Sequence, residues 1–475
     1  MSSSSNKTRS LFIFRRDFRI KDNTGLIKAL SESDEVIPIF IFTPEQIKSN
    51  PYKSDNAVQF MIESLLDLNT KLKELNFFYG NYIKVIDSIV KSVLSSSTQS
   101  IQKIYTNTDY TPYAIKRDAD IAKYCKKNKI DFHPIHDILL FEPSTLLNLS
   151  GGIYQKYTPF YRKALSEVKK INSVSKSSES TLVKKAKIIR IKKNKYLISK
   201  KELAKFYKHN PVLNINGGRD NALKVLASLK GFKKYDDERN LLNIETTHLS
   251  GYLKFGCLSI REVFFHLKKI FGLSNGLIKQ LIWREFYYHL GFGKTERFGK
   301  SLKEQYDKIK WKKNTKHLEA WKEGLTGFPV VDAAMTQLNT KGYMHNRGRL
   351  LTASFLIKNL GIDWREGEKY FAQKLLDYDV LVNNGNWQWV SGSGADSQPY
   401  FRVFNPTLQS TKFDVDCEYI KRWLPNLKDI PAKHLHNWSD FYKEYNLADI
   451  NYVKPIVDYK ESKASALELY KSALK

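Results

Sequence analysis

The segment 363–389, DWREGEKYFAQKLLDYDVLVNNGNWQW, combines residue types that could hold a flat, polar-edged cofactor. It contains three Trp, five carboxylates and the adjacent Asn383 and Asn384. Trp is large and carries a single N–H donor, so several Trp beside Asp377 and Asp379 would form a pocket that is apolar on one side and hydrogen-bonding on the other. Each residue alone is more often a core anchor or part of a solvated helix face. The hypothesis of a site therefore depends on the rest of the chain.

The distribution of Trp along the chain is uneven. All eight Trp lie at or after Trp283, which predicts two unlike domains. With 475 residues and an apolar fraction of 42%, the chain is long enough for two to three domains with a sizeable core.

Net charge is the second strong signal. A formal charge of +29 and a pI near 9.6 attract polyanions, and such binding weakens as salt rises. Nucleic acid is the natural candidate for a partner, although an overall richness in Lys, Asn and Ile accounts for part of the charge.

Cysteine usage and the N-terminal sequence indicate where the protein works. Cys125, Cys257 and Cys417 are widely spaced and odd in number, which excludes a disulfide framework and a cysteine-rich zinc site; we expect no metal site. The start, MSSSSNKTRS, has no apolar signal core, and no run approaches the ~18 apolar residues that span a bilayer. We expect an intracellular protein, cytoplasmic or nuclear, not secreted and not in a membrane. The basic run 184–195 fits either a nuclear signal or a solvated linker.

The first part of the chain alternates between predicted strands and helices. SLFIFRRDF is a short apolar strand, and VIPIFIF is a β-branched and aromatic run typical of a strand buried on both faces. AVQFMIESLLDLNTKLKEL has helical periodicity, and IQKIYTNTDY and KIDFHPIHDILL continue the pattern. Strands separated by helices predict a parallel, Rossmann-like α/β domain over residues 8–140. It carries no GxGxxG or Walker loop.

The middle of the chain predicts a linker and the remainder predicts helices. From about Ser166 to Lys195 the sequence is rich in Ser and Lys with little apolar periodicity, and we assign residues 141–215 to the linker. Beyond Gly217, apolar residues recur at three-to-four spacing in 221–232, 260–271, 275–290, 329–341 and 346–360. These segments predict a larger all-α domain over residues 216–475.

Five ordered motifs in the second half are similar to those of the photolyase and cryptochrome family. They are IWREFY, MHNRGRLLTASFL, DWREGEKYF, LDYDVLVNNGNWQW and PYFRVFNP, and FRRDFRIKDNTGL near the start resembles that family's opening strand and loop. The resemblance runs from about Leu11 to Ile456, and five motifs in order are far more specific than any one of them. It implies FAD bound non-covalently in the helical domain.

The resemblance assigns flavin contacts to particular residues. Arg349 matches the Arg that pairs with the carboxylate at Asp377, and Asp379 matches the acid that hydrogen-bonds the flavin ring edge. The family usually carries Ser and Arg where Thr247 and His248 stand, so we expect one weaker phosphate contact. The phosphate and ribose contacts, made through hydroxyls and backbone amides, match Tyr235, Thr246, Thr247, His248, Leu249 and Ser250.

Two further matches concern electron transfer. Asn383 falls beside the flavin's reactive nitrogen, and because Asn does not readily donate a proton it preserves the reduced anionic flavin. Plant cryptochromes tend to carry Asp there and insect cryptochromes Cys, so Asn favours a repair enzyme. Trp387, Trp364 and Trp311 match the chain of three Trp by which the family photoreduces its flavin.

Repair of a base pair taken out of the duplex needs a basic surface around an apolar pocket. Trp283 and Trp389 match the two aromatic residues that pack on a flipped pyrimidine dimer, and Gln280, Asn346 and Asn383 complete the catalytic set that the resemblance implies. The DNA contacts that it implies are Arg239, Trp283, Asn346, Arg347, Arg402 and Gln409.

Two positions depart from the class I photolyases that act on cyclobutane dimers. Those enzymes carry Glu where this chain has Gln280, and Met where it has Leu350. Gln at the first position is common in (6-4) photolyases. However, (6-4) photolyases place His at the positions held here by Asn346 and Leu350, and their chemistry needs a His acid. The residues therefore favour cyclobutane dimers.

The segment 107–118, NTDYTPYAIKRD, resembles the loop that supplies an acid to the pterin in folate-binding members. Tyr113 and Ala114 stand where those members have polar and acidic residues, so folate is not favoured. A deazaflavin, a second flavin and the absence of an antenna chromophore all stay open.

The leading hypothesis is light-driven repair of cyclobutane pyrimidine dimers in DNA by electron transfer from excited reduced FAD, which is a carbon–carbon lyase reaction. Damaged DNA is then the partner, and we expect a monomer. The alternatives are a cryptochrome-like blue-light photoreceptor, a (6-4) photolyase and a non-catalytic DNA-binding relative.

Overall fold

A parallel sheet forms the core of the first domain. The computed structural model describes residues 7–48, 50–96, 100–171 and 187–474. Within these residues the strands lie in the order β3-β2-β1-β4-β5, all parallel, and β6 pairs with the start of β2. This is a doubly wound α/β arrangement, and it confirms the predicted fold class. The strands are β1 (Arg9–Phe14), β2 (Glu35–Phe42), β3 (Asn76–Tyr79), β4 (Lys103–Asn107), β5 (Asp131–Ile135) and β6 (Lys187–Ile188).

The two faces of this sheet carry different side chains. Because side chains alternate along a strand, Ile13 and Ile39 pack in an aliphatic cluster on one face. Phe12 and Phe40 point to the other face, into a cluster that continues into the helical domain. Burial on both faces explains the unbroken apolar run of β2. The aromatic face anchors the sheet to the second domain.

Side-chain caps mark where the surrounding helices begin. Asn23, Ser54 and Thr111 each accept a backbone N–H from the first turn of the helix that follows, which satisfies a donor that has no partner within the helix. The helices of this domain are α1 (Thr24–Glu32), α2 (Pro44–Ile47), α3 (Asp55–Leu72), α4 (Tyr82–Ser96) and α5 (Pro112–Lys127).

The region predicted as a linker, 141–215, contains ordered elements. Its helix α6 (Tyr157–Glu167) buries Phe160 and Ala164 and packs against the helical domain. Strand β6 joins the sheet beside β2, and α8 (Lys200–Leu203) follows. Residues 172–186, the centre of the Ser- and Lys-rich stretch, lie outside the described residues. Apart from that stretch, the linker is bound to both domains.

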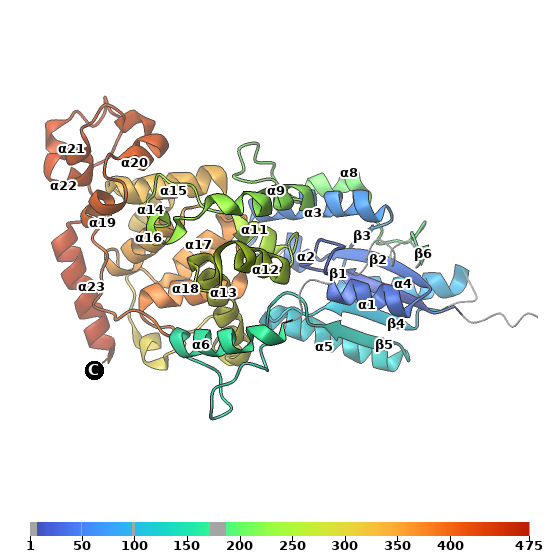
Figure 1. Ribbon diagram of the computed structural model, residues 1–475. Helices are drawn as coiled ribbons and strands as arrows, with labels where there is room; N and C mark the ends of the chain where they lie inside the picture. The colour runs from blue at the N-terminus through green and yellow to red at the C-terminus, as the bar shows by residue number, and fades with distance from the viewer. Residues whose placement is uncertain (1–6, 49, 97–99, 172–186, 475) are drawn as a thin grey trace, which may run out of the picture.

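Helices make up the rest of the described chain. Figure 1 shows them gathered at one end of the molecule and the sheet at the other, with α23 along the outer side. None of the described helices is long and apolar enough to cross a membrane. The helices are α9 (Arg219–Ser228), α10 (Tyr235–Glu238), α11 (Leu249–Lys254), α12 (Ile260–Phe271), α13 (Gly276–Gly293), α14 (Thr315–Glu323), α15 (Pro329–Lys341), α16 (Asn346–Lys358), α17 (Trp364–Lys374), α18 (Val380–Ser391), α19 (Pro406–Phe413), α20 (Glu418–Trp423), α21 (Ala432–His436), α22 (Trp438–Phe441) and α23 (Tyr459–Leu474).

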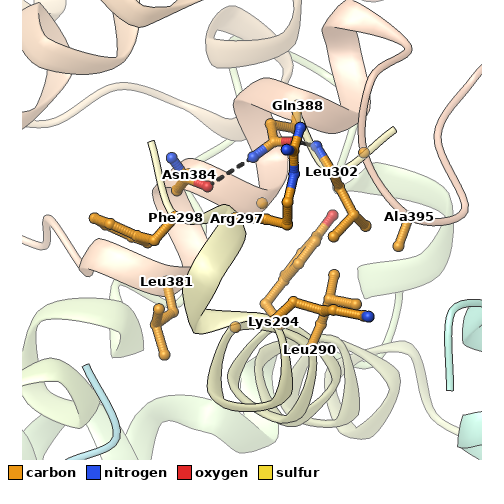
Figure 2. Close-up of a pocket in the computed structure, with 13 residues that line it drawn as sticks. Leu290, Lys294, Arg297, Phe298, Leu302, Leu381, Asn384, Gln388 and Ala395 are labelled. Atoms are coloured by element: carbon orange, nitrogen blue, oxygen red, sulfur yellow. Dashed lines mark hydrogen bonds between the residues drawn. The ribbon is translucent and has the colours of Figure 1, made fainter. Parts of the chain in front are cut away.

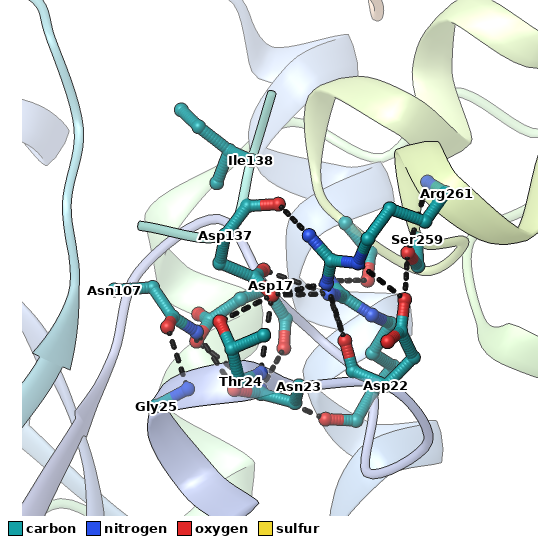
Figure 3. Close-up of polar contacts among 12 residues, drawn as sticks. Asp17, Asp22, Asn23, Thr24, Gly25, Asn107, Asp137, Ile138, Ser259 and Arg261 are labelled. Atoms are coloured by element: carbon teal, nitrogen blue, oxygen red, sulfur yellow. Dashed lines mark hydrogen bonds and ion pairs between the residues drawn. The ribbon is translucent and has the colours of Figure 1, made fainter. Parts of the chain in front are cut away.

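A buried ionic network fixes the helical domain to the sheet domain (Figure 3). Asp137 accepts hydrogen bonds from Arg19 at 2.7 and 2.8 Å and from Arg261 of α12 at 2.8 Å, and Arg261 also donates to Asp22 at 2.9 Å. Burial acts to raise the pKa of Asp137, but the two guanidinium groups outweigh it and hold that pKa below its usual range. Removing one partner of such a buried pair typically costs about 3–5 kcal/mol.

Candidate active site

A buried carboxylate joins three helical segments at the centre of the second domain. Asp377, between α17 and α18, accepts hydrogen bonds from Arg349 Nη2 of α16 at 2.9 and 3.2 Å and from Ser250 Oγ of α11 at 2.6 Å. Burial lowers the pKa of Arg349, but Asp377 more than offsets this and the pKa ends above its ordinary value. The Arg349–Asp377 pair expected from the sequence is therefore formed.

Side chains of the run Thr246–Ser250 contact residues outside the run. The Thr246 hydroxyl lies 2.9 Å from the Tyr343 hydroxyl, and Leu249 is buried. His248 has a φ of 51°, and its ring nitrogens contact the Asn214 amide at 3.0 Å and Glu245 at 2.9 Å. Both ring nitrogens are thus engaged within the protein. The weaker phosphate contact expected at this position, where the family usually has Arg, stays a prediction.

Thr247 lies within this run, and Tyr235 precedes it in the sequence. Thr247 is half-buried in the loop before α11. Tyr235 is the half-buried first residue of α10, and its hydroxyl interacts with Arg239. Burial is the main cause that raises the pKa of Tyr235, so the hydroxyl stays protonated at neutral pH.

Asp379, the N-cap residue of α18, is ionised, and its side chain makes no capping hydrogen bond. Its Oδ2 accepts a hydrogen bond from Tyr288 Oη at 2.6 Å and another from Arg16 of the sheet domain. Burial acts to raise the pKa of Asp379, yet Arg16, Lys254 and other cations hold it below its usual range. Its Oδ1 is buried and has no hydrogen-bond partner among the described residues. A donor N–H brought to this oxygen would be bound strongly.

Asn383 is oriented by Glu368. Its Nδ2 donates to Glu368 Oε1 at 3.1 Å and to the Glu368 carbonyl at 3.3 Å. Burial raises the pKa of Glu368 to about 7, against the lowering effect of hydrogen bonds from Asn383 and Tyr378. Neither Glu368 nor Arg16 was assigned a role from the sequence. Arg16 reaches Asp379 from the sheet domain, and Glu368 meets Asn383 because α17 packs against α18.

The three predicted electron-transfer Trp belong to one hydrophobic cluster. Trp387 and Trp364 are buried within it, and Trp311 is half-buried and packs against it. Trp387 lies against Phe371, with ring centroids 4.9 Å apart. Trp311 contacts Tyr470 edge-on at 5.8 Å. The order of burial, from Trp387 and Trp364 to Trp311, runs from the interior toward the surface.

Four of the predicted DNA contacts gather on one surface, which we call the arginine patch: Arg239, Arg347, Arg402 and Gln409. Arg347 Nη1 lies 3.4 Å from Gln409 Oε1, and its guanidinium lies 4.3 Å from the centroid of the Phe413 ring. Burial lowers the pKa of Arg347, and the nearby Arg239 and Arg402 lower it further. Three neighbouring cations of this kind suit a polyanionic partner. Asn346, one residue before Arg347, is exposed.

The two aromatic residues predicted to contact a lesion come from neighbouring helices. Trp283 is on α13 and Trp389 on α18, and these helices pack against each other. Trp283 packs against the cluster shared with the sheet domain and Trp389 against the cluster of the distal helices. Gln280, one turn before Trp283, is half-buried.

A cavity of about 580 Å³ lies between the two domains. Its lining includes residues of the predicted antenna loop and residues of the helical domain, and none of the predicted flavin contacts lines it. Arg15 lines it with buried Nε and Nη2 groups that lack hydrogen-bond partners in the described structure, and burial lowers its pKa to about 10. Among the other lining residues are Asp109, Thr111, Tyr113, Arg117, Lys254 and Trp364.

A second cavity, of about 40 Å³, lies between α13 and α18 (Figure 2). Gln388 Nε2 donates to Asn384 Oδ1 at 2.9 Å in its wall, and Lys294 and Arg297 also line it. This volume holds no more than a few waters, so the cavity cannot take a flavin or a base.

Comparisons with known proteins agree with this arrangement. A family model described as DNA photolyase matches residues 10–179, and one described as the FAD binding domain of DNA photolyase matches residues 277–472. The deoxyribodipyrimidine photo-lyase of Buchnera aphidicola subsp. Acyrthosiphon pisum is 34% identical over 492 aligned positions, which cover 98% of this chain and 97% of that protein. The chain belongs to the photolyase and cryptochrome family.

Solved structures of both a photolyase and a cryptochrome are similar to this chain. An archaeal photolyase from Sulfolobus tokodaii, whose crystal structure is described with two FAD molecules, shares 37% identity and a TM-score of 0.84 over 98% of this chain and 100% of its own. A cryptochrome from Synechocystis shares 25% identity and a TM-score of 0.85 over 97% of this chain and 99% of its own. The fold therefore does not separate repair from signalling, and the residues of the site must do so.

The residues of this photolyase-family chain fit FAD. Asp379 Oδ1, which has no hydrogen-bond partner among the described residues, has the chemistry to accept the N–H at a flavin ring edge. Arg349, bound to Asp377, places a cation beside the same segment. The hydroxyls of Thr246 and Ser250 come from the run predicted to meet phosphate and ribose. FAD is accordingly the cofactor of the helical domain.

Proposed function

We propose that this chain repairs cyclobutane pyrimidine dimers in DNA with light, as a deoxyribodipyrimidine photo-lyase that uses FAD. One observation carries the proposal: the start of α16 contributes residues both to the flavin contacts and to the arginine patch. Arg349 turns inward to Asp377 and the flavin contacts, and Arg347 turns outward to Gln409 and the arginine patch. A single rigid helix thus places a DNA-binding cation within one turn of a cofactor-binding cation. Because its substrate is DNA, the enzyme acts inside the cell, in the cytoplasm or the nucleus.

Each part of the site has a distinct task in this reaction. Bound FAD supplies light absorption and a transferable electron. Arg349, Asp377 and Asp379 hold the cofactor, and Asn383, oriented by Glu368, places an amide rather than an acid beside it. Trp283 and Trp389 stack on the extruded dimer, because stacking on aromatic rings is worth ~1–3 kcal/mol per base. Gln280 donates an N–H to a dimer carbonyl, where negative charge accumulates before the ring splits.

Two residues favour cyclobutane dimers over (6-4) products. The (6-4) reaction needs a His acid, and the two positions that would supply it hold Asn346 and Leu350. Neither side chain can deliver a proton at neutral pH. Asn383 likewise favours repair over signalling, since it offers no ready proton to the cofactor.

The test is direct. Purified protein with reduced FAD is mixed with duplexes that carry either one cyclobutane thymine dimer or one (6-4) product, and both lesions are quantified in the dark and after blue light. We expect loss of the cyclobutane dimer in light only, and no loss of the (6-4) product. Loss of neither lesion, with binding retained, would favour a photoreceptor or a DNA-binding relative.

A second chromophore is proposed for the 580 Å³ cavity between the domains. Arg15 Nε and Nη2, which have no hydrogen-bond partner in the described part of the chain, and the neighbouring Arg117 and Lys254 favour a ligand with an anionic group. A flavin is supported among the alternatives because the photolyase from Sulfolobus tokodaii is described with two FAD molecules. After reconstitution with excess FAD, denatured protein should release close to two FAD per chain, and one FAD per chain would contradict a second flavin.

A further inference from the structure

Trp283 is covered on one face by a residue of the predicted linker. The Tyr157 ring, at the start of α6, stacks on the Trp283 ring with centroids 3.7 Å apart and planes 4° from parallel. Such a parallel, close pair differs from the edge-on contacts of Trp283 with Phe286, at 5.6 Å and 86°. Trp283 remains partly exposed despite this cover.

Tyr157 is fixed by hydrogen bonds at its side-chain hydroxyl and at its backbone N–H. Its hydroxyl donates to the carbonyl of Lys279 on α13 at 2.9 Å, and its backbone N–H donates to Asp396 Oδ2 at 3.1 Å. Lys156 reinforces the second contact through an ion pair with Asp396 at 3.5 Å. Asp396 belongs to the loop that leads from α18 to Arg402 of the arginine patch. Tyr157 therefore links the helix that carries Trp283 to the loop that carries a predicted DNA contact.

This arrangement restricts the Trp283 side chain before any DNA arrives. An indole that stacks against a fixed ring cannot rotate freely about its side-chain bonds, so less rotamer entropy is lost when its other face meets a base. The order of rings, with Tyr157 behind Trp283, also presents a flat surface to a flipped dimer.

We propose that Tyr157 is a positioning residue for lesion recognition, which backs one face of Trp283 so that the opposite face of the indole stacks on the pyrimidine dimer. The inference rests on the proposed function, because it takes Trp283 as a lesion contact. Tyr157 itself does not touch the dimer. Its effect on recognition must therefore pass through Trp283.

The experiment is a double-mutant cycle on the FAD-containing protein. Affinities are measured in the dark for a duplex with one thymine dimer and for the same duplex undamaged, and the ratio of the two is compared. The variants are Tyr157→Leu, Tyr157→Met and Tyr157→Phe, each alone and with Trp283→Ala. Tyr161→Leu is the matched control, because Tyr161 stacks on Tyr157 at 5.7 Å from the next turn of α6.

We expect Tyr157→Leu and Tyr157→Met to lower the damaged-to-intact ratio by roughly three- to tenfold, as for the loss of one aromatic pair. Tyr157→Phe, which keeps the ring, should stay within about twofold of wild type, as should Tyr161→Leu. In the Trp283→Ala background the Leu and Met variants should have no further effect. FAD content and circular dichroism establish that each variant is folded, and Tyr157→Met keeps most of the side-chain volume in case Tyr157→Leu is unstable.

Other outcomes overturn the inference in distinguishable ways. An equal loss with and without Trp283 would mean that Tyr157 acts on the fold rather than on the indole. A higher affinity for the dimer in Tyr157→Leu would mean that Tyr157 occupies the place of the lesion. An unchanged ratio in Trp283→Ala alone would remove Trp283 from the lesion site, and that result would contradict the proposed site and not merely the role of Tyr157.

Discussion

The indole of Trp387 lies directly against the backbone of α17 at Gly367. A Cβ at that position would come within 2.1 Å of Trp387 Cη2 and 2.5 Å of Cζ3. Trp364 is one helical turn earlier on α17. The absence of a side chain at Gly367 therefore lets Trp387 approach the helix that carries the next Trp of the predicted electron-transfer chain.

Gly367→Ala should disturb both stability and electron transfer. The added methyl forces the Trp387 ring to move, and overpacking of this kind typically costs about 1–3 kcal/mol. We expect a lower midpoint of denaturant unfolding and slower light-driven flavin reduction. Gly231→Ala is the control, since a Cβ there meets no atom within 4 Å. Normal photoreduction in a destabilised Gly367→Ala would show that the position of Trp387 does not limit the electron path.

Trp387→Phe separates photoreduction from repair. Phe keeps much of the packing but is far harder to oxidise than Trp, so light-driven reduction of oxidised flavin should stop. Enzyme reduced chemically beforehand should still repair dimers at close to the wild-type rate. Trp438→Phe, which changes another fully buried Trp of the same cluster, should affect neither. If Trp387→Phe photoreduces normally, another residue is the first electron donor.

The elements that the sequence predicted are those with long periodic or continuous apolar patterns. The run in β2 and the helices α12, α13, α15 and α16 lie close to their expected positions. Strand β3 is four residues long and β6 only two, too short to show a period of their own. β6 forms because it pairs with β2, which lies about 150 positions earlier in the chain. The local Lys-rich sequence carries no sign of this pairing, so it resembles a linker.

The same limit applies to the site. Arg349 and Asp377 could be paired in advance because both lie in motifs of a known family. Glu368, Arg16 and Tyr157 contact Asn383, Asp379 and Trp283 across domain or helix boundaries. Such contacts depend on how helices dock, and no local spacing in the sequence encodes them.

Glu368 should make stability depend on pH. Its pKa is raised by burial from 4.5 to about 7, so between these values the folded protein binds a proton that the unfolded chain has released. The contribution of Glu368 to the free energy of unfolding therefore falls by about 3 kcal/mol in total as pH rises from 4.5 to about 7. Glu368→Gln removes this dependence.

The check on Glu368 is the difference in unfolding free energy between Glu368→Gln and wild type. It should be larger at pH 8 than at pH 4.5, in favour of the variant. Only the difference matters, because other buried acids such as Asp332 titrate in both proteins. A difference that does not change with pH would mean that the pKa of Glu368 is the same in the folded and unfolded protein.

Arg402 should contribute affinity without selectivity. Each phosphate contact on duplex DNA adds roughly 0.9 to the slope of log affinity against log salt, so Arg402→Ala should weaken binding to damaged and intact duplexes alike and flatten that slope by up to this amount. Arg190→Ala, which removes a cation that is 73% exposed beside the sheet, is the control and should leave the slope nearly unchanged. A loss confined to damaged DNA would instead place Arg402 at the lesion.

Variants of Gln280 test how the negative charge on the dimer is stabilised before the ring splits. A Gln amide donates a hydrogen bond at every pH, whereas a Glu at this position must be held protonated in an apolar site to do the same. We therefore expect wild-type repair of cyclobutane dimers with little dependence on pH. Gln280→Glu should preserve or raise the yield at low pH, where the acid is protonated, and lose that advantage as pH rises.

The measurement is the quantum yield of repair by pre-reduced enzyme between pH 5.5 and 8.5, with Gln280→Leu as the variant that cannot donate. If donation matters, Gln280→Leu should fall well below both other proteins at every pH, because preorganised donors commonly contribute tenfold or more to such steps. Equal yields in all three proteins would mean that the dimer carbonyl finds its donor elsewhere. Since none of the wild-type side chains Gln280, Asn346 and Leu350 can deliver a proton, any loss of (6-4) products in the wild type would require a different acid in the site. That result would overturn the assignment to cyclobutane dimers.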